Sequence, residues 1–443
     1  MAPAEGACAP LNPAFVAQME ALLGAEAPAF CAALEAPAAL ALRVNPARPA
    51  AGELRPLFAR DPVPWAENGY YLLPGARPGA GLSHFCGAFY VQEASAMLPA
   101  ALLDVRPGQR VLDLCAAPGG KSSQLAAALG GEGLLISNEP EPKRAKVLAG
   151  NLERLGVPNA IVVNEYPEKL ARKWLGFFDA VLVDAPCSGE GMFRREPDSR
   201  SQWQPNSPAG CAKRQAGILD RAAELLRPGG RLVYSTCTYN TAENEETVAA
   251  FLARHPEFSP GDFSVPGLSS IAPGQWKIYP HRVRGDGQFA ALLLKAPGPA
   301  PALRPPAPEK AALALWKEFT AQFGFPGPGV PRMWGEFLTL LPEDTPDLSG
   351  VRVVQPGLIL AQARGRRLEP AHALAMALDS LPGAELSDEA ALAFARGEAV
   401  PWEGRGYLVA RWRGMPLGWG KASDGLLKNH LPKGLRRANL EKF

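Results

Sequence analysis

The sequence has no long apolar segment and no recognisable leader. Every Ala- and Leu-rich stretch is interrupted by Pro, Gly or a charged residue before about eighteen apolar residues accumulate, which argues against a transmembrane span. Residues 1–10 contain an acidic residue and no basic one, which argues against a signal peptide. We therefore expect a cytoplasmic protein that does not contact a membrane.

The seven cysteines lack the spacing of a disulfide framework or of a zinc site. Their number is odd, and no Cys-x-x-Cys pair or Cys/His cluster occurs, so we expect free thiols and no bound metal. The formal net charge is only +2, because 46 basic residues face 44 acidic ones. A nucleic-acid partner would then be bound by local basic patches. We expect the chain to act as a monomer.

The length favours several domains. A chain of 443 residues is too long for one compact core and suggests about three domains. Residues 1–105 combine a helical stretch at 13–34 with short apolar runs at 40–44 and 69–73, which predicts a small α+β module.

The segment 106–296 predicts a doubly wound α/β core. Continuous apolar runs alternate with helical patterns, as in a parallel sheet that is covered on both faces. A turn is expected at 228–230, and helices are expected at 122–129 and 143–155. The expected strands are 110–114, 133–137, 160–163, 178–183, 231–235 and 289–295.

The rest of the chain begins with a proline-rich linker. Residues 297–310 cannot form a regular hydrogen-bond ladder, because proline lacks the backbone N–H. Residues 311–443 are predicted to form a C-terminal α+β domain, with helices near 309–323 and 370–377. Its clearest strand is 406–412, and the Arg-Gly pair that follows has the composition of a hairpin turn.

The loop at 111–122 has the composition of a ligand-binding turn. It joins the first predicted strand to its helix, which is where doubly wound folds bind nucleotide-like ligands. It has neither GxGxxG nor GxxxxGK[ST] spacing, so NAD and ATP fit poorly. Glu139, at the end of the second strand, is placed to accept hydrogen bonds from ribose hydroxyls, and Asp113 lies under the loop. The alternative is a structural turn rich in Gly and Pro.

Two cysteines follow neighbouring strands of the predicted sheet. Cys187 comes shortly after Asp184 at the end of the fourth strand, and Cys237 comes after the fifth. Since the carboxyl ends of neighbouring parallel strands meet at one edge, both thiols are expected beside the ligand-binding loop. The alternatives are two small buried hydrophobic residues or a catalytic disulfide. Cys115, inside the loop, is expected to serve in packing.

Two thiols beside a nucleotide-like cofactor fit the methylation of cytosine at carbon 5. This carbon is a poor nucleophile until a thiolate adds to carbon 6 and makes the ring an electron-rich enamine. A second thiol can then assist loss of the carbon 5 proton and release of the sulfur. Burial would favour the neutral form of Asp184, which is predicted to protonate or hydrogen-bond N3 and the exocyclic amine.

Three motifs occur in one order along the predicted core. They are Asp-Leu-Cys-Ala-Ala-Pro-Gly-Gly-Lys at 113–121, Asp-Ala-Pro-Cys-Ser-Gly-Glu-Gly-Met at 184–192 and Ser-Thr-Cys-Thr-Tyr at 235–239. Together they resemble the Nol/Nop/Sun family of RNA cytosine-5 methyltransferases, and the similarity extends to 90–97 and 279–289. The resemblance implies a Rossmann-like class I methyltransferase core.

The resemblance also implies roles for individual residues. Cys237 would be the nucleophile, and Cys187 would assist product release. Members of the family often have an acidic residue after the third strand that contacts the adenine. This chain has Asn164 and then Glu165 at that place, so both residues stay candidates for the adenine contact. The residues implied to bind S-adenosylmethionine are Cys115, Ala116, Ala117, Pro118, Gly119, Gly120, Lys121, Glu139, Asn164 and Asp184.

Residues 416–421 and 427–436 resemble the bacterial RsmF-type branch of that family. This resemblance implies a PUA-like RNA-binding domain within 311–443. It also implies a substrate in 16S rRNA of the small ribosomal subunit, near the decoding site. The alternatives are a tRNA cytosine-5 methyltransferase and a ribosome-assembly factor that binds RNA without turnover.

Basic side chains are the candidates for holding RNA. Between 421 and 437, five Lys or Arg residues face one acidic residue, a pattern that suits phosphate contacts and is equally compatible with a solvated surface. Trp412 and Trp419 are expected to stack bases. Arg194 and Arg195 are predicted to touch the RNA beside a flipped cytosine, and the alternative is that they are ordinary surface charges. The C-terminal candidates are Lys421, Lys428, Lys433 and Arg436.

Overall fold

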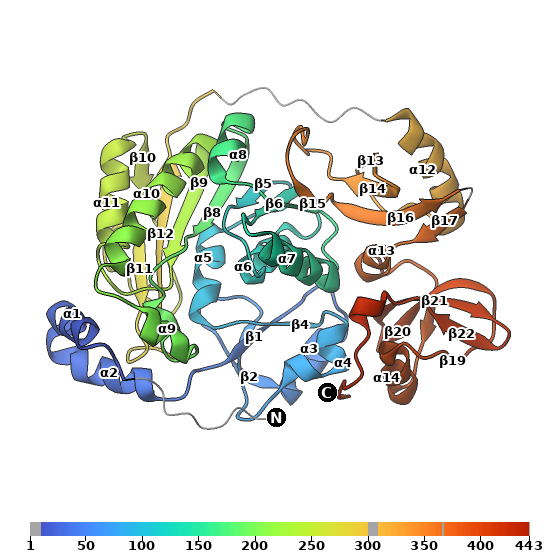
Figure 1. Ribbon diagram of the computed structural model, residues 1–443, viewed down its shortest axis with the longest axis horizontal. Helices are drawn as coiled ribbons and strands as arrows, with labels where there is room; N and C mark the ends of the chain where they lie inside the picture. The colour runs from blue at the N-terminus through green and yellow to red at the C-terminus, as the bar shows by residue number, and fades with distance from the viewer. Residues whose placement is uncertain (1–9, 300–308, 366, 443) are drawn as a thin grey trace.

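The computed structural model describes residues 10–299, 309–365 and 367–442. A nine-stranded sheet covered by helices occupies the middle of the molecule, with the N-terminal residues below it and the C-terminal sheets at one side (Figure 1). Most of the expected linker, residues 300–308, lies outside the described residues. Within the described ranges, none of the helices combines the length and apolar character that crossing a bilayer requires.

The N-terminal module is a helical pair followed by a four-stranded antiparallel sheet with the order β2-β3-β1-β4. The helix expected at 13–34 is divided into α1 (Pro13–Leu23) and α2 (Ala27–Glu35), because Gly24 has a φ of 54° and begins a 3-10 turn, η1 (Gly24–Glu26). The other elements are β1 (Ala41–Val44), α3 (Ala51–Leu54), η2 (Arg55–Leu57), β2 (Ala59–Pro62), β3 (Gly69–Leu72), η3 (Pro78–Ala80), α4 (Leu82–Phe85), β4 (Phe89–Val91) and η4 (Ser95–Met97).

The core sheet has the strand order β10-β12-β9-β8-β5-β6-β7-β15, with β11 paired to β12. Its five central strands are parallel, and β12 is antiparallel to β9. The turn expected at 228–230 lies inside β9, where the register against β8 shifts. The strands are β5 (Arg110–Asp113), β6 (Leu134–Asn138), β7 (Ala160–Val163), β8 (Phe178–Asp184), β9 (Leu226–Thr236), β10 (Phe258–Pro260), β11 (Gln275–Ile278) and β12 (Gln288–Lys295).

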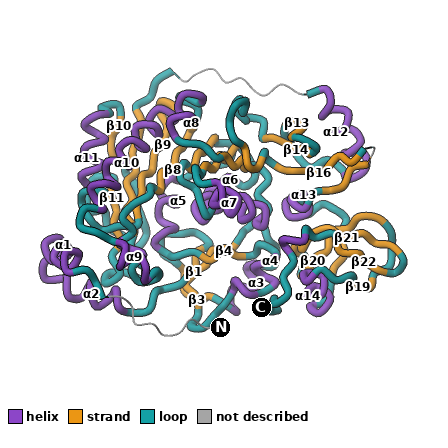
Figure 2. Tube along the Cα trace, in the orientation of Figure 1, coloured by secondary structure: helices purple, strands orange, loops and turns teal. Residues whose placement is uncertain are grey.

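Helices cover both faces of this sheet (Figure 2). Val111 of β5 packs in the core formed with α5 (Leu98–Leu103), α6 (Gly120–Leu129) and α7 (Pro142–Leu155). The next residue, Leu112, packs in the opposite core with α8 (Pro167–Lys173), α10 (Ser207–Leu225) and α11 (Glu245–Arg254). Alternate side chains of a strand point to opposite faces, so both faces are buried and the doubly wound α/β class is confirmed. The loop after β8 holds η5 (Glu190–Met192) and α9 (Pro197–Gln202).

The C-terminal residues form two sheets, where the sequence predicted one domain. Their strand orders are β13-β14-β16-β17 and β18-β20-β21-β22-β19, and the hairpin expected after 406–412 joins β20 to β21. An additional strand, β15 (Val353–Gln355), extends the core sheet by pairing antiparallel with β7. The elements are α12 (Lys310–Phe323), β13 (Val330–Trp334), β14 (Phe337–Leu341), β16 (Leu358–Arg364), β17 (Arg367–Pro370), α13 (His372–Ala377), β18 (Gly383–Glu385), α14 (Asp388–Arg396), β19 (Val400–Pro401), β20 (Gly406–Trp412), β21 (Met415–Ser423), β22 (Leu426–Asn429) and η6 (Lys433–Leu435).

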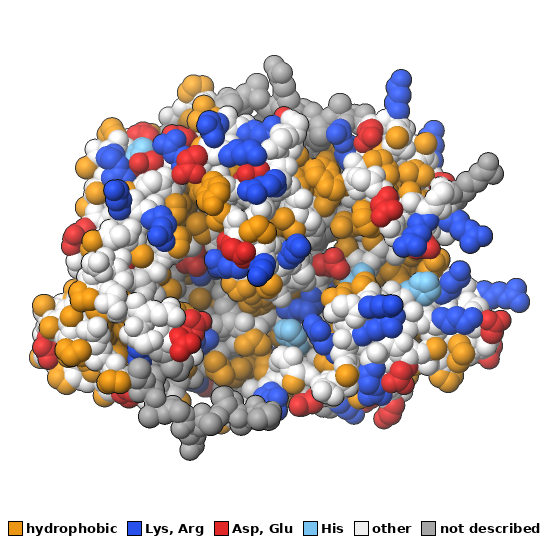
Figure 3. All heavy atoms as spheres, in the orientation of Figure 1, with side chains coloured by type: hydrophobic (Ala, Val, Ile, Leu, Met, Phe, Trp, Pro, Cys, Tyr) orange, Lys and Arg blue, Asp and Glu red, His pale blue; other side chains and the backbone are white. Residues whose placement is uncertain are grey.

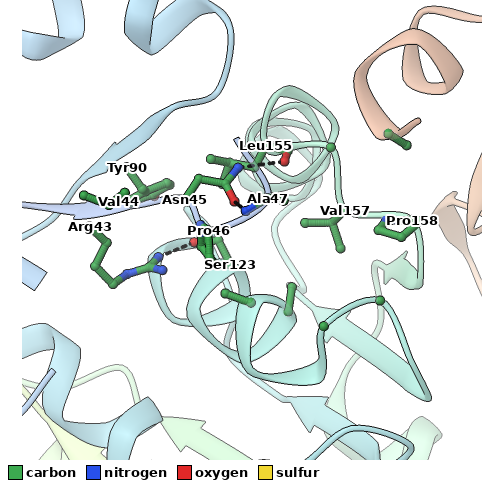
Figure 4. A pocket seen from close by; sticks show the side chains of 16 residues that line it. Arg43, Val44, Asn45, Pro46, Ala47, Tyr90, Ser123, Leu155, Val157 and Pro158 are labelled. Atoms are coloured by element: carbon green, nitrogen blue, oxygen red, sulfur yellow. Dashed lines mark hydrogen bonds between the residues drawn. The ribbon is translucent and has the colours of Figure 1, made fainter. Parts of the chain in front are cut away.

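Buried polar side chains attach the N-terminal sheet to the core. Arg43 of β1 is 5% exposed and donates to the Gly120 carbonyl (2.7 Å) and to Ser123 Oγ (2.5 Å) at the start of α6. Asn45 donates to the Leu155 carbonyl at the end of α7 (3.0 Å), and both sets of contacts border a cavity of about 420 Å³ (Figure 4). The N-terminal module therefore fixes the helix that begins at the ligand-binding loop.

Candidate active site

The loop between β5 and α6 forms one wall of a small cavity. Gly119 has a φ of 110°, which favours glycine, and an added Cβ there would lie 3.1 Å from Leu148 Cδ1 of α7. From the same helix, Arg144 and Asn151 donate to two carbonyls of the loop, at 2.9 and 2.8 Å. The cavity has a volume of about 230 Å³, and the loop residues that line it are Cys115, Ala116, Ala117, Pro118, Gly120 and Lys121.

Polar side chains follow the next two strands, outside the lining of this cavity. Glu139 comes directly after β6 and is 3% exposed. Asn164 comes directly after β7 and donates to the Glu139 carbonyl (2.7 Å). Glu165 accepts from Lys169 Nζ (2.7 Å) and from the backbone of Arg352 (2.8 Å). Because Glu165 is already engaged by these donors, Asn164 is the better candidate for an adenine contact.

Asp113 ends β5 beneath the loop and lines the cavity. It is fully buried, its Oδ2 accepts from Ser122 Oγ (2.7 Å), and its Oδ1 has no hydrogen-bond partner among the described residues. Burial raises the pKa of Asp113 to about 7, although the Ser122 hydrogen bond opposes the rise. With Asp184 in the same lining, the carboxyl groups fit the cationic sulfonium and ammonium groups of S-adenosylmethionine, the cofactor that the motifs imply.

Asp184 forms an ion pair with Lys121 at the edge of the cavity. Lys121 Nζ lies 2.6 Å from Asp184 Oδ2, and Asp184 Oδ1 accepts from Ser235 Oγ (2.7 Å) and Gln288 Nε2 (3.2 Å). Burial acts to lower the pKa of Lys121, but the charge and hydrogen bond of Asp184 outweigh it and raise that pKa. The sequence favoured a neutral Asp184, whereas these three donors fit a charged carboxylate, which accepts hydrogen bonds only.

Cys187 and Cys237 meet where the loops after β8 and β9 come together. Their sulfurs are 3.3 Å apart, and both cysteines are free. The hydrogen bond with Cys237 and burial raise the pKa of Cys187 well above its usual range. Negative charge on Cys187 is therefore disfavoured while Cys237 lies beside it. The Lys121 ammonium is close enough to interact with Cys237.

A buried carboxylate holds each cysteine loop to the other. Glu243, in the loop after Cys237, accepts from the backbone N–H of Ser188 (3.0 Å), the residue that follows Cys187. Glu190, in the loop after Cys187, accepts from the backbone N–H of Tyr239 (2.8 Å), close to Cys237. Both carboxylates are fully buried. Burial raises the pKa of Glu243, although the donors around it oppose the rise.

Sequence reasoning missed both carboxylates. Glu190 lies inside the motif at 184–192, but its hydrogen-bond partners come from residues about fifty positions later. An available signal was the presence of an acidic residue shortly after each cysteine-bearing strand. Buried charges without metal or counter-ion are rare unless they accept several hydrogen bonds, so such residues point to a fixed loop.

Arg194 and Arg195, predicted to touch RNA, are engaged within the protein. Arg194 has a side chain 7% exposed, lies 3.3 Å from Asp286 Oδ1 and donates to the Ala36 carbonyl (3.3 Å). Arg195 also pairs with Asp286 and lines the 230 Å³ cavity. Their observed contacts join the loop after β8 to the N-terminal module, and Arg195 alone of the two faces the site.

The C-terminal basic candidates fall into two groups. Lys421 and Lys428 are cross-strand neighbours on β21 and β22, and Lys428 pairs with Asp424 (3.0 Å). Lys433 and Arg436 lie in and directly after η6, and Arg436 lines a groove beside α7. The four side chains therefore come from two different parts of the C-terminal domain, and only Arg436 lines this groove.

Trp412 and Trp419 do not form a base-stacking surface. They are 0% and 2% exposed, and their indole N–H groups donate to Asp388 Oδ1 (2.7 Å) and to the Ala371 carbonyl (2.8 Å). The expectation that they stack bases was wrong, because each ring packs in a hydrophobic core.

Four families match successive parts of the chain. Residues 11–94 match the N-terminal domain of 16S rRNA methyltransferase RsmF, and residues 100–294 match 16S rRNA methyltransferase RsmB/F. Residues 317–378 match the RsmF rRNA methyltransferase first C-terminal domain, and residues 383–437 match the methyltransferase RsmF PUA domain. The two C-terminal matches correspond to the two sheets of that region.

Solved structures share the core fold. A methyltransferase homolog protein from Pyrococcus horikoshii is 29% identical, with a TM-score of 0.56 over 63% of this chain and 94% of that one. NSun6 from the same organism, solved with SFG, has a TM-score of 0.57 at 21% identity over 65% of this chain and 99% of its own, which shows the fold alone.

Relatives with a named activity match almost the whole chain. The ribosomal RNA small subunit methyltransferase F of Klebsiella pneumoniae is 34% identical over an alignment 461 positions long, which covers 96% of the residues of each chain. The protein of the same name from Escherichia coli is 33% identical over an alignment 443 positions long, which covers 92% of the residues of each chain. The chain therefore belongs to the RsmB/F family of 16S rRNA methyltransferases, in its RsmF branch.

Proposed function

We propose that this rRNA methyltransferase transfers a methyl group to carbon 5 of a cytosine in 16S rRNA, with Cys237 as a covalent nucleophile. The observation that carries the proposal is the 3.3 Å separation of two free thiols beside the Asp184–Lys121 pair. A sulfur that adds to carbon 6 of the ring makes carbon 5 nucleophilic, which divides one difficult step into easier ones.

The environments of the two sulfurs support different roles. Cys237 adds to the ring as the thiolate, which the Lys121 ammonium favours, and in this state the Cys187 thiol is the donor of the hydrogen bond between the two sulfurs. Cys187, whose pKa is raised by that hydrogen bond and by burial, remains protonated until the adduct forms. After methylation the carbon 5 proton must leave and the carbon–sulfur bond must break, and Cys187 assists this release.

Asp184 orients the cytosine in this proposal. Its charged carboxylate accepts a hydrogen bond from the exocyclic amine of the base. Lys121, Ser235 and Gln288 hold the carboxylate in place from three different elements of the core. Fixed polar groups of this kind need little rearrangement when charge develops on the ring.

S-adenosylmethionine supplies the methyl group of this enzyme. The cavity beside the loop, with Asp113 and Asp184 in its lining, suits the cationic end of the cofactor. Glu139 and Asn164, at the ends of β6 and β7, suit the ribose and the adenine. The glycines let the backbone approach these groups closely, as is usual at the first turn of a doubly wound fold.

The substrate proposal rests on matches that span the core and its flanking domains. Relatives called ribosomal RNA small subunit methyltransferase F match more than nine-tenths of the chain, so 16S rRNA is proposed here as well, with a target near the decoding site. A tRNA cytosine-5 methyltransferase is the alternative substrate assignment. An assembly factor without turnover is disfavoured, because both thiols and the Asp184–Lys121 pair are in place.

Two cysteine variants test the chemistry. Cys237→Ala should abolish methyl transfer to 16S rRNA, whereas Cys187→Ala should accumulate a covalent protein–RNA adduct that is visible on a denaturing gel. Cys31→Ala is the matched control, because Cys31 is a partly exposed cysteine on α2. If Cys187→Ala releases product at the normal rate and forms no adduct, the roles assigned to the two sulfurs are wrong.

Bisulfite sequencing tests the substrate. RNA from a strain that lacks the gene should lose 5-methylcytosine in 16S rRNA near the decoding site. Loss in tRNA alone would support the alternative substrate.

A further inference from the structure

A groove is lined by the N-terminal module, by α7 of the methyltransferase core and by the segment at the end of the C-terminal PUA domain. Its volume is about 740 Å³, and Figure 3 shows basic and histidine side chains in a hollow between these parts. A second cavity of about 290 Å³ adjoins it, because both are lined by Glu153 and His372. The polar residues that characterise the groove are His84, Asn151, Arg154, His372, Arg436 and Arg437.

The charge of the groove suits a polyanion. Three guanidinium groups, those of Arg154, Arg436 and Arg437, face a single carboxyl group in the lining, that of Glu153. Burial raises the pKa of Glu153. Burial, together with the charges of Arg154 and Arg437, lowers the pKa of His84 to about 4, so its ring is neutral near pH 7.

The groove shares a helix with the cofactor site. Asn151 lines the groove and also donates to the Pro118 carbonyl of the ligand-binding loop (2.8 Å). One turn of α7 earlier in the chain, Val147 lines the same groove. A strand bound there would therefore lie against the helix that supports the methyl-donor site.

We propose that this interdomain groove binds the phosphodiester backbone of one strand of the RNA substrate. The proposal rests on the proposed rRNA substrate and assigns the path that this RNA follows. Phosphates contact Arg437, which is exposed, and RNA bound in this way bridges α7 and the segment after η6. Lys421 and Lys428 lie outside the groove lining and do not contribute to this path.

The choice of RNA over a protein partner follows from the chemistry of the lining. Guanidinium and amide groups bind phosphate oxygens without reading sequence, and neutral histidine rings can stack on bases. Burial lowers the pKa of His372 to about 4, so its ring is neutral near pH 7. The guanidinium groups therefore suit the phosphates of a nucleotide, and the neutral histidine rings suit its base.

Charge reversal at one residue tests the path. Arg437→Glu should weaken binding of in vitro transcribed 16S rRNA and reduce its salt dependence. When the salt concentration is raised fourfold, the Kd of each protein increases by some factor. One lost phosphate contact should make this factor about threefold smaller for the variant than for the wild type. The KM for RNA should rise while kcat stays within about twofold, because Arg437 does not touch the reacting atoms.

The matched control is Arg172→Glu. Arg172 is exposed on the last turn of α8. This helix follows β7 and runs away from the carboxyl edge of the sheet, where the cysteines lie. Arg172 therefore lies toward the opposite edge of the sheet. Both variants change the net charge equally, and both should keep the wild-type melting temperature. Amide hydrogen exchange should also show protection of residues 147–154 and 435–440 when the RNA is added to the wild type.

Two results would overturn the path. One is equal RNA affinity and salt dependence for Arg437→Glu and Arg172→Glu, and the other is unchanged exchange at 147–154 and 435–440 in the RNA complex. These binding measurements are independent of the cysteine chemistry. If RNA binds as expected but neither cysteine variant behaves as proposed, the reaction mechanism fails and the groove assignment stands.

Discussion

Replacement of Glu243 by glutamine tests whether this buried carboxylate positions Cys187. Its Oε2 accepts from Ser188 N and Gln215 Nε2, and its Oε1 accepts from Ser188 Oγ and Asn240 Nδ2. Whichever way the new amide is turned, its NH₂ group replaces one oxygen and faces two donors. The substitution keeps the shape of the side chain and changes only its hydrogen bonding.

The cost of this exchange follows from the number of donors that lose an acceptor. The Ser188 hydroxyl can turn to accept from the new amide, but Gln215 cannot turn its own amide without loss, because its Nε2 also donates to the Pro186 carbonyl (3.1 Å). One or two donors then remain unsatisfied, at a cost of about 1–3 kcal/mol each. We expect the free energy of unfolding to fall by about 2–4 kcal/mol, and the loop that carries Cys187 to lose its fixed position.

The assay separates positioning from destabilisation alone. Well below its melting temperature, Glu243→Gln should accumulate the covalent RNA adduct, because Cys237 still adds to the ring while Cys187 no longer assists release. Glu246→Gln is the control, since Glu246 is an exposed glutamate on the neighbouring helix α11. A variant that melts earlier yet releases product at the wild-type rate, with no adduct, would show that Glu243 stabilises the fold only.

Two further substitutions test the site. Burial raises the pKa of Asp113 from 3.8 to about 7. The stability that the protonated carboxyl group contributes to the folded protein is therefore fully present below the unfolded-state pKa and is lost as the pH rises through about 7. Between about pH 5.5 and about pH 8.5, urea denaturation without cofactor should show the wild type losing about 2 kcal/mol more than Asp113→Asn, and equal losses would contradict this. In Gly191→Ala, the new Cβ would lie 2.9 Å from the Cys237 carbonyl oxygen and 3.0 Å from that of Gly287, so backbone beside Cys237, the proposed nucleophile, must move. Single-turnover adduct formation should slow by about tenfold or more with cofactor affinity unchanged, and an unaltered rate would show that the nucleophile tolerates the shift.

The core fold was predictable because its strands are buried on both faces. Runs such as residues 160–163 and 178–183 are almost entirely apolar, and this pattern distinguishes a covered parallel sheet from an exposed one. The order of β8 and β9 beside β5 followed from the usual topology of such sheets. Long-range pairing was not predictable, because β15 contains only three residues and pairs with a strand far away in the chain.

Surface roles were predicted less well than core elements. Their position near basic residues suggested that Trp412 and Trp419 were available for RNA, but their rings fill hydrophobic cores, and the sequence alone does not show which face of a strand is covered. Arg194 and Arg195 are engaged by Asp286, a partner about ninety positions later in the chain. Sequence reasoning identifies the basic residue in such cases but cannot identify the charge that it meets.

The separation of the two sulfurs depends on the hydrogen bonds that join their loops. The backbone N–H of Gly191, four residues after Cys187, donates to the Cys237 carbonyl (2.8 Å), and Glu190 and Glu243 add side-chain contacts in both directions. The raised pKa of Cys187 comes first from its hydrogen bond with Cys237, so moving either loop would remove part of that effect. The contact that raises the pKa of Cys187 is thus the same one that joins it to Cys237, the proposed nucleophile. Any substitution that separates the loops should therefore disturb product release before it disturbs cofactor binding, which depends on β5, β6 and β7.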